Sequence, residues 1–445
     1  MAGNQIPHEL LAKLAGQIIQ DPGIPVSAPT VSAWQEPAHP IATIQSDELP
    51  QRTDFAIIGS GITGTSVAKT LLENGPARDK TSQWGFLLSH APPFFKRYAE
   101  AFGTDAARQI ALFCDRTLES IVDIAKAENL DKASQIRNVT TVASFEDEEG
   151  FADVTESIHT AEKEYHLKKS SGALVIHSRV FWPYRLVTTL LQSLLQLYPE
   201  RFAIETHTPV ISVTIDEADN EYPYILTTPR GTVRAAKVFH CTSGFTGHLL
   251  PKLRGAIFPC RLSMTTQKPG PHTTLVEQGL YWMQQNAETG DLFVGGDLQR
   301  LDDFLFSDDS LISADSARNL TDLLLKRLFK EGWTNPITNT TMSSTTALHR
   351  VWSGILSMTA DQVPIVGSVP TSISGRNVEG GEWIAAGFNG YGMSQCWLCG
   401  EAIARMALGE PKPEWLPDVY LSAEKRLGDE ASMGPEAALA SFFAT

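Results

Sequence analysis

A glycine-rich turn between a short apolar run and a helix-like segment constrains the fold of this chain more than any other feature. Gly59, Gly61 and Gly64 have G-x-G-x-x-G spacing, after the apolar run 53–58 and before the helix-like run 65–73. In this pattern the glycines permit a tight turn, close approach of a pyrophosphate, and close helix–strand packing. The N–H groups at the helix N-terminus then face the phosphates. The flanks predict a dinucleotide-binding turn, and a glycine turn of another α/β fold is the alternative.

The acidic residue that normally completes this pattern is missing. It follows the glycines by about 20 residues and binds the ribose hydroxyls at the end of the second strand. Residues 80–99 contain neither Asp nor Glu, and the strand-like run 84–89 would place Ser89 or His90 at that position. Either side chain is a poorer ribose anchor than a carboxylate, so we expect an unusual ribose-binding end.

Composition narrows the class of protein. The 445 residues carry a net charge of -15, which argues against a nucleic-acid partner or a membrane surface because both require basic patches. No run approaches the roughly 20 apolar residues of a membrane span. The five cysteines follow no evident signal peptide, so we expect a reducing, cytoplasmic location. Cys396 and Cys399 fall inside a predicted helix as buried residues, and no metal site is expected.

A second glycine-rich loop follows near the end of the chain. The strand-like run 383–386 leads into residues 387–393, of sequence GFNGYGM, and a helix is predicted from residue 394. With residues 351–367, this loop resembles the terminal flavin-contacting segment of the D-amino-acid oxidase and DadA-like family of FAD-dependent oxidoreductases. Residues 172–174 and 208–210 resemble the family's adenine-binding stretch, and residues 241–251 resemble the loop before its flavin site. The resemblance covers residues 54–406.

This resemblance implies the fold, the cofactor and its contacts. The fold is α/β, with a Rossmann-like FAD-binding domain of the GR2 type and a substrate domain of antiparallel sheet and helices. The FAD-binding domain would comprise residues 51–100, 170–265 and 346–412, and the substrate domain residues 101–169 and 266–345. Residues 1–50 would form a helix and an extended arm over the surface, and residues 413–445 a C-terminal tail. The expected contacts of a noncovalent FAD are Gly59, Ser60, Gly61, Ile62, Thr63, Gly64, Val210, Gly387, Asn389, Gly390, Tyr391, Gly392 and Met393.

The chain departs from the family between residues 76 and 90. The family has there a second strand ending in Glu and a glycine-rich loop lying against the flavin, and this segment is too short to contain both. Two interpretations follow: a working FAD-dependent oxidoreductase with a shortened segment, or a degenerate, inactive flavin-fold protein without stable FAD. An NAD(P)H–flavin reductase with two nucleotide sites is disfavoured because the sequence shows no second strand–GxGxxG–helix unit.

The resemblance also implies the type of reaction. The family transfers a hydride from a carbon bearing nitrogen to the flavin, and oxygen is the candidate electron acceptor. Several members bind a substrate carboxylate through an Arg just after Trp-x-Gly, but residues 355–358 contain no Arg. This favours a small-molecule amine, as in the γ-glutamylputrescine oxidase-like branch, over a free amino acid. The substrate-side candidates are His349, Arg350, Trp352 and Tyr391. The alternatives are core packing for Trp352 and a hydrogen-bonded surface or core residue for His349. No catalytic residue or oligomeric state is predicted.

Overall fold

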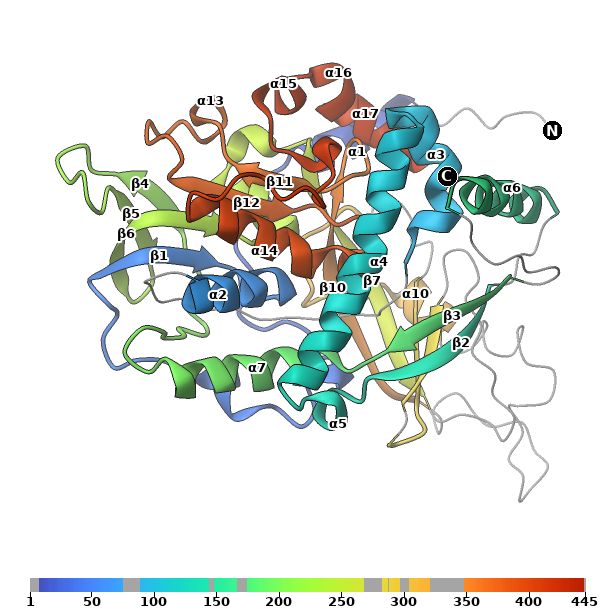
Figure 1. The fold of residues 1–445 in the computed structure, drawn as a ribbon, viewed down its shortest axis with the longest axis horizontal. Helices are drawn as coiled ribbons and strands as arrows, with labels where there is room; N and C mark the ends of the chain where they lie inside the picture. Colours follow the sequence, from blue (N-terminus) through green and yellow to red (C-terminus); the bar gives the residue numbers. More distant parts are fainter. Residues whose placement is uncertain are drawn as a thin grey trace.

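The computed structural model describes residues 8–74, 89–143, 148–165, 174–267, 282–286, 288–296, 304–320 and 348–443. They form a mixed sheet that carries helices, an antiparallel sheet and a two-stranded ribbon (Figure 1). Most of the shortened segment that distinguishes this sequence, residues 75–88, lies outside the described residues.

Three strands of the mixed sheet, β1, β6 and β12, run parallel, and the glycine turn directly follows β1. β6 pairs with β1 along one edge, from Arg52↔Arg234 to Ile58↔His240. Its other edge pairs with β5 in the first half and with β12 near the carboxyl end. The turns that follow β1 and β12 therefore lie at the same edge of the sheet, where ligands of doubly wound folds bind. The strands are β1 (Arg52–Ile58), β4 (Ser212–Ile215), β5 (Tyr224–Thr228), β6 (Gly231–His240), β11 (Ile365–Ser368) and β12 (Glu382–Ala386).

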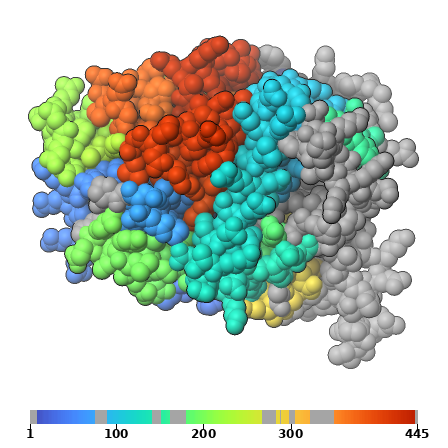
Figure 2. Space-filling view, in the orientation of Figure 1, coloured from blue at the N-terminus to red at the C-terminus, as the bar shows by residue number. Residues whose placement is uncertain are grey.

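Helices α2 (Ile62–Asn74) and α14 (Cys396–Ala407) follow β1 and β12 and pack against each other. Gly400 permits their close approach, since a Cβ there would lie 2.3 Å from Thr63 O. The Ser66 hydroxyl also donates a hydrogen bond to Trp397 O at 2.6 Å. With α4 (Thr104–Ala127) and α7 (Pro183–Leu197), the two helices cover one face of the molecule (Figure 2), and all four contribute to the largest hydrophobic core.

The antiparallel sheet lies beside this unit. β10 pairs with β7 from Arg350↔Thr266 to Thr359↔Ile257, and β9 and β8 follow on the other edge of β7. Helices α1 (His8–Ile18) and α17 (Pro435–Phe443) pack together against it, with Leu14 and Ile18 in the same cluster as Phe258. The strands are β7 (Ile257–Gln267), β8 (Trp282–Gln285), β9 (Leu292–Gly295) and β10 (Leu348–Thr359); the separate ribbon is β2 (Arg137–Ala143) with β3 (Leu174–Val180).

The remaining helices are shorter or lie at the periphery. They are α3 (Ala91–Phe102), α5 (Asp131–Ser134), α6 (Glu148–Tyr165), α8 (Thr246–Leu249), α10 (Ala314–Arg318), α13 (Thr371–Ser374), α15 (Glu424–Leu427) and α16 (Glu430–Met433). No helix among the described residues is both long enough and apolar enough to cross a membrane.

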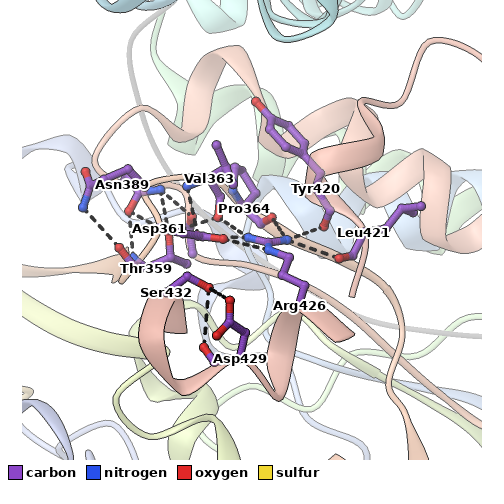
Figure 3. Close-up of polar contacts among 12 residues, drawn as sticks. Thr359, Asp361, Val363, Pro364, Asn389, Tyr420, Leu421, Arg426, Asp429 and Ser432 are labelled. Carbon is purple, nitrogen blue, oxygen red and sulfur yellow. Dashed lines mark hydrogen bonds and ion pairs between the residues drawn. The ribbon is translucent and has the colours of Figure 1, made fainter. Parts of the chain in front are cut away.

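The C-terminal segment is held to the body of the protein by the largely buried guanidinium of Arg426. Arg426 donates from Nε and Nη2 to the two carboxylate oxygens of Asp361, at 2.8 and 3.0 Å (Figure 3). Its remaining N–H groups donate to the carbonyl oxygens of Val363, Pro364, Tyr420 and Leu421. The predicted tail is therefore a packed part of the fold, fixed to the turn between β10 and β11.

The fold confirms the predicted class. The helical segments α3 and α4 meet at Gly103, which has a φ of +87°. Helix α4, which the sequence placed in the substrate domain, shares the core of α2 and α14. The predicted domain boundaries stay a prediction.

Candidate cofactor and substrate site

A cavity of about 2290 Å³ is lined by residues of both sheets and of the N-terminal segment 23–43. Sites for drug-sized ligands span about 300–1,000 Å³, so this cavity is large enough for a dinucleotide and a small substrate together. The N-terminal arm was predicted to lie over the surface, but its Trp34 is buried and lines the cavity. The arm is therefore one wall of the candidate site.

The turn after β1 lines one end of this cavity through Gly59, Ser60, Gly61, Ile62 and Thr63. Gly59 has a φ of +109°, and a Cβ there would lie 2.2 Å from the carbonyl oxygen of Cys241. Both the backbone conformation and the lack of space require glycine. The turn leads into the N-terminus of α2, whose free N–H groups and dipole favour an anionic group. This end of the cavity is suited to a phosphate.

The second glycine-rich loop lines the same cavity. Gly390, Tyr391, Gly392 and Met393 reach it from the segment between β12 and α14, and Val210 reaches it from the stretch before β4. Ten of the thirteen predicted cofactor contacts thus line one cavity, although they come from three distant parts of the sequence. That these ten residues contact a cofactor stays a prediction.

The other three predicted contacts, Gly64, Gly387 and Asn389, lie outside the lining. Gly64 is buried within α2. Gly387 has a φ of +81°, and a Cβ there would lie 2.3 Å from Thr359 Cγ2, so it packs against β10. Asn389 accepts a hydrogen bond at Oδ1 from Thr359 N at 2.8 Å (Figure 3). Its own backbone N–H donates to Ser357 O at 2.9 Å. Gly387 and Asn389 therefore attach the loop to β10.

His90 supports the same loop from the other side. Its imidazole stacks on the Tyr391 ring, with centroids 4.4 Å apart and an interplanar angle of 15°. Nδ1 lies 3.0 Å from Ser394 Oγ, and Nε2 lies 3.0 Å from the Tyr98 hydroxyl. Burial lowers the pKa of His90 to about 3, so the ring is neutral near pH 7. The sequence analysis placed Ser89 or His90 at the position of the missing ribose-binding acid. His90 is not part of the cavity lining.

The four substrate-side candidates are separated by the structure. Trp352 and Tyr391 line the cavity, whereas His349 and Arg350 are not part of its lining. Arg350 forms an ion pair with Glu36 at 2.6 Å. His349 Nδ1 lies 3.5 Å from a carboxylate oxygen of Asp291 on a partly exposed surface. Only Trp352 and Tyr391 of the four therefore stay candidates for contact with a substrate.

The charged groups of the lining are mostly paired. Arg52 pairs with Asp219, and Glu205 pairs with Arg230 at 2.5 Å. Arg179 differs: within the described residues it donates one hydrogen bond, from Nε to Asn138 Oδ1 at 3.2 Å, and pairs with no carboxylate. A guanidinium is always charged and is shaped to hold a carboxylate through two bonds. Arg179 is thus a candidate anion anchor that the sequence alone did not single out.

A buried ion pair fixes the strand ends behind the site. Arg376 donates from Nε and Nη2 to the two oxygens of Glu382, each at 2.7 Å, and His240 Nε2 donates to Glu382 Oε2 at 2.8 Å. Burial by itself raises the pKa of Glu382, but these hydrogen bonds outweigh it and lower the pKa to about 2. Because His240 ends β6 and Glu382 begins β12, the contact joins two parallel strands.

Several cavity residues were missed by sequence reasoning. Trp34 comes from the arm, Met264 from β7 and Trp282 from β8, and all three line the cavity. Tryptophan in an apolar run is most often a packing residue. The one available signal in the sequence is that the chain contains nine tryptophans. This count does not indicate which tryptophans lie close together in the fold.

Comparisons with known proteins agree with this arrangement. The family model described as "FAD dependent oxidoreductase" matches residues 54–406. The fold is similar to glycine oxidase from Geobacillus kaustophilus, at 16% identity and a TM-score of 0.59, covering 84% of this chain and 99% of that one. L-amino acid deaminase from Proteus vulgaris, with its specific insertion deleted, is 16% identical with a TM-score of 0.60, covering 87% of this chain and 98% of that one.

Iminodiacetate oxidase from Chelativorans sp. BNC1 is likewise 16% identical with a TM-score of 0.60, covering 82% of this chain and 98% of that one. At 16% identity these structural similarities support the fold alone. No curated protein matches the chain significantly. The family match covers most of the sequence, including both glycine-rich segments that meet at the cavity. The chain belongs to the family of FAD-dependent oxidoreductases.

Proposed function

We propose that this enzyme binds FAD noncovalently and oxidises a C–N bond of a small amine or amino acid. The observation that carries the proposal is the meeting of the turn 59–63 and the loop 390–393 at one large cavity. Three structurally similar proteins are named as oxidases or deaminases of glycine, L-amino acids and iminodiacetate, all of which contain a C–N bond.

The residues present are compatible with FAD. The glycine turn and the N-terminus of α2 would hold the pyrophosphate, Val210 would adjoin the adenine, and the loop 390–393 would adjoin the flavin ring. Bound FAD supplies the acceptor for a hydride. Cys396 also lines the cavity, but burial raises the pKa of its thiol to about 12. A protonated thiol is a poor nucleophile, which supports noncovalent attachment.

Arg179 bears on the choice between an amine and an amino acid. Among the described residues its guanidinium pairs with no carboxylate, and it lines a cavity whose lining is largely apolar. A substrate carboxylate would complete the pair. This observation favours a substrate that carries a carboxylate, against the sequence-based preference for a simple amine as in the γ-glutamylputrescine oxidase-like branch.

Asp309 is the candidate to receive a proton from the substrate. An amine must be neutral at nitrogen before a hydride leaves the adjacent carbon, so a nearby base helps. Asp309 lines the cavity and pairs with no cation among the described residues, and burial raises the pKa of its carboxyl. Glu36 and Glu205, the other acids of the lining, are neutralised by Arg350 and Arg230.

The visible spectrum of the purified protein tests the proposal. We expect flavin absorption, either as purified or after reconstitution with FAD. We also expect anaerobic bleaching by an amine or an α-amino acid, with the two classes added separately. Gly59→Ala should lose FAD because its Cβ meets Cys241 O, whereas Gly16→Ala, with nothing within 4 Å, should retain it.

A colourless protein that FAD cannot reconstitute would contradict the proposal and favour the degenerate alternative. If the flavin is present and bleaches with amines but not with amino acids, the role of Arg179 is wrong and the amine branch is supported. Reoxidation of the bleached flavin by air tests oxygen as the acceptor, and failure to reoxidise would exclude it.

A further inference from the structure

One wall of the cavity is a row of large side chains that crosses the antiparallel sheet. Trp282 of β8 is paired with Gly295 of β9, Gly295 with Met264 of β7, and Met264 with Trp352 of β10. Residues directly opposite one another on neighbouring strands project from the same face of a sheet. Trp282, Met264 and Trp352 all line the cavity, so this face is turned towards it.

The single glycine in this row makes room for an indole ring. A Cβ on Gly295 would lie 2.5 Å from Cζ2 of Trp282, and 2.9 Å from two further atoms of the same ring. The Trp282 ring therefore occupies the space that a side chain at residue 295 would fill, so any residue larger than glycine there would displace the ring. Trp282 and Met264 are half-buried, which leaves part of each side chain open to the cavity.

A second set of aromatic rings holds the row in place. Trp34 of the arm packs on Phe293 with centroids 4.0 Å apart, and Phe293 lies edge-on to Trp352 at 6.1 Å. The Trp182 indole donates to Trp34 O at 2.6 Å, which fixes the arm. Trp34 and Trp352 are almost completely buried, so Trp282 and Met264 provide most of the exposed area of this wall.

The row lies at the opposite end of β10 from the predicted flavin loop. Ser357 accepts a hydrogen bond from Asn389 N, and Trp352 is five residues earlier on the same strand. At about 3.4 Å per residue this separation is roughly 17 Å. The aromatic wall is thus separated by this distance from the loop predicted to adjoin the flavin ring, although both line the same cavity. We expect a group of the substrate, rather than the nucleotide, to contact the wall.

We infer that Trp282 and Met264, the two half-buried members of the row Trp282–Gly295–Met264–Trp352, form a binding surface for a planar aromatic group of the substrate. The inference rests on the proposed function and names the substrate class: aromatic amines or amino acids, with Arg179 as the anchor for a carboxylate. The Trp282 indole can stack on a planar ring, and the Met264 sulfur can contact the edge of that ring. A saturated ring of similar size makes neither contact.

Two acids without nitrogen test this surface independently of turnover. 3-Phenylpropionate and 3-cyclohexylpropionate have the same charge and chain length, and the saturated ring is the more hydrophobic of the two. Calorimetric titration of the FAD-loaded protein should give about 2- to 12-fold tighter binding of the phenyl compound, the range expected for one aromatic pair. Equal affinities, or tighter binding of the cyclohexyl compound, would overturn the inference.

Variants locate the effect. Trp282→Leu and Gly295→Ala should each bring the affinity ratio of the two acids to one or below, the second by displacing the indole. Trp415→Leu is the matched control, since Trp415 packs on Phe113 and is not in the cavity lining. A ratio that is unchanged in both row variants refutes the surface even if one of them folds poorly.

The outcome is distinguishable from failure of the proposed function. Preferential binding of the phenyl acid without bleaching by any amine or amino acid would leave the aromatic surface standing and refute the oxidase. Bleaching by amines, together with equal affinities for the two acids, would support the oxidase and refute the aromatic surface.

Discussion

Replacement of Arg426 offers a direct measure of how strongly the C-terminal segment is tied to the site. Arg426→Met removes the five N–H groups that bind Asp361 and four backbone carbonyls, while roughly keeping the volume of the side chain. The side chains of Arg426 and Asp361 are 14% and 10% exposed. Removing one partner of a buried pair costs about 3–5 kcal/mol because the other charge is left uncompensated.

Arg426→Lys separates charge from geometry. Lysine keeps the positive charge but cannot donate the paired bonds of the guanidinium fork. We expect it to lose about 1–3 kcal/mol, the cost of a buried acceptor left without its donor. The double variant Arg426→Met with Asp361→Leu should recover much of the loss of Arg426→Met, since no unpaired carboxylate remains.

The clamp should also influence the cofactor end of the cavity. It fixes the backbone at Tyr420, whose hydroxyl donates to Gln395 Oε1 at 2.8 Å. Gln395 Nε2 in turn donates to the carbonyl oxygens of Phe388 and Tyr391. Arg426→Met should therefore weaken FAD binding as well as stability.

Urea titration followed by tryptophan fluorescence measures the free energy of unfolding, and FAD titration of the apoprotein measures the affinity. A loss below about 1 kcal/mol for Arg426→Met, as for an exposed ion pair, would refute the reasoning. So would equal stability of the methionine and lysine variants.

Three further predictions concern packing and pH. Gly400→Val should destabilise the protein by about 1–3 kcal/mol through overpacking, because its Cβ would lie 2.3 Å from Thr63 O; thermal unfolding should show no such loss for Gly16→Ala, which has nothing within 4 Å. The pKa of Glu382 is lowered from 4.5 to about 2, so its contribution of roughly 3 kcal/mol is present above pH 4.5 and is lost as the pH falls towards 2; Glu382→Gln should flatten acid unfolding in that window. The pKa of His90 is lowered from 6.5 to about 3, so stability should fall as the pH drops below 6.5, and a steep decline that persists in His90→Gln would contradict this assignment.

The parts of the fold that sequence predicted well contain their own local signal. The runs 53–58 and 65–73 became β1 (Arg52–Ile58) and α2 (Ile62–Asn74), because an apolar run, a glycine turn and a helical pattern follow one another directly. The break between α3 and α4 at Gly103 has no such signal, because the apolar pattern continues from one helix into the other. Ten predicted cofactor contacts line the cavity for the same reason: each belongs to a short motif of fixed spacing.

The substrate end was hidden because it depends on pairing between distant strands. The row from Trp282 to Trp352 exists only in the observed register, and a shift of one residue would turn those side chains to the opposite face. Arg179 and Trp34 reach the cavity from a ribbon and from an arm that have no motif. His349 and Arg350 were chosen for their closeness in sequence to Trp352, but they lie outside the lining.

A single strand sets the spacing between the two ends of the cavity. β10 contributes Trp352 to the aromatic row, while its Ser357 and Thr359 bind the loop that holds Asn389. The one irregularity in its pairing with β7 lies between Leu348 and Arg350, before this stretch. The intervening ladder is continuous, so neither end can slide along β10 without breaking it. The arm that carries Trp34, by contrast, is held by side-chain contacts and short turns. Changes of substrate preference should therefore come more readily from substitutions in the arm and in β8 than from any in β10, which would disturb both ends together.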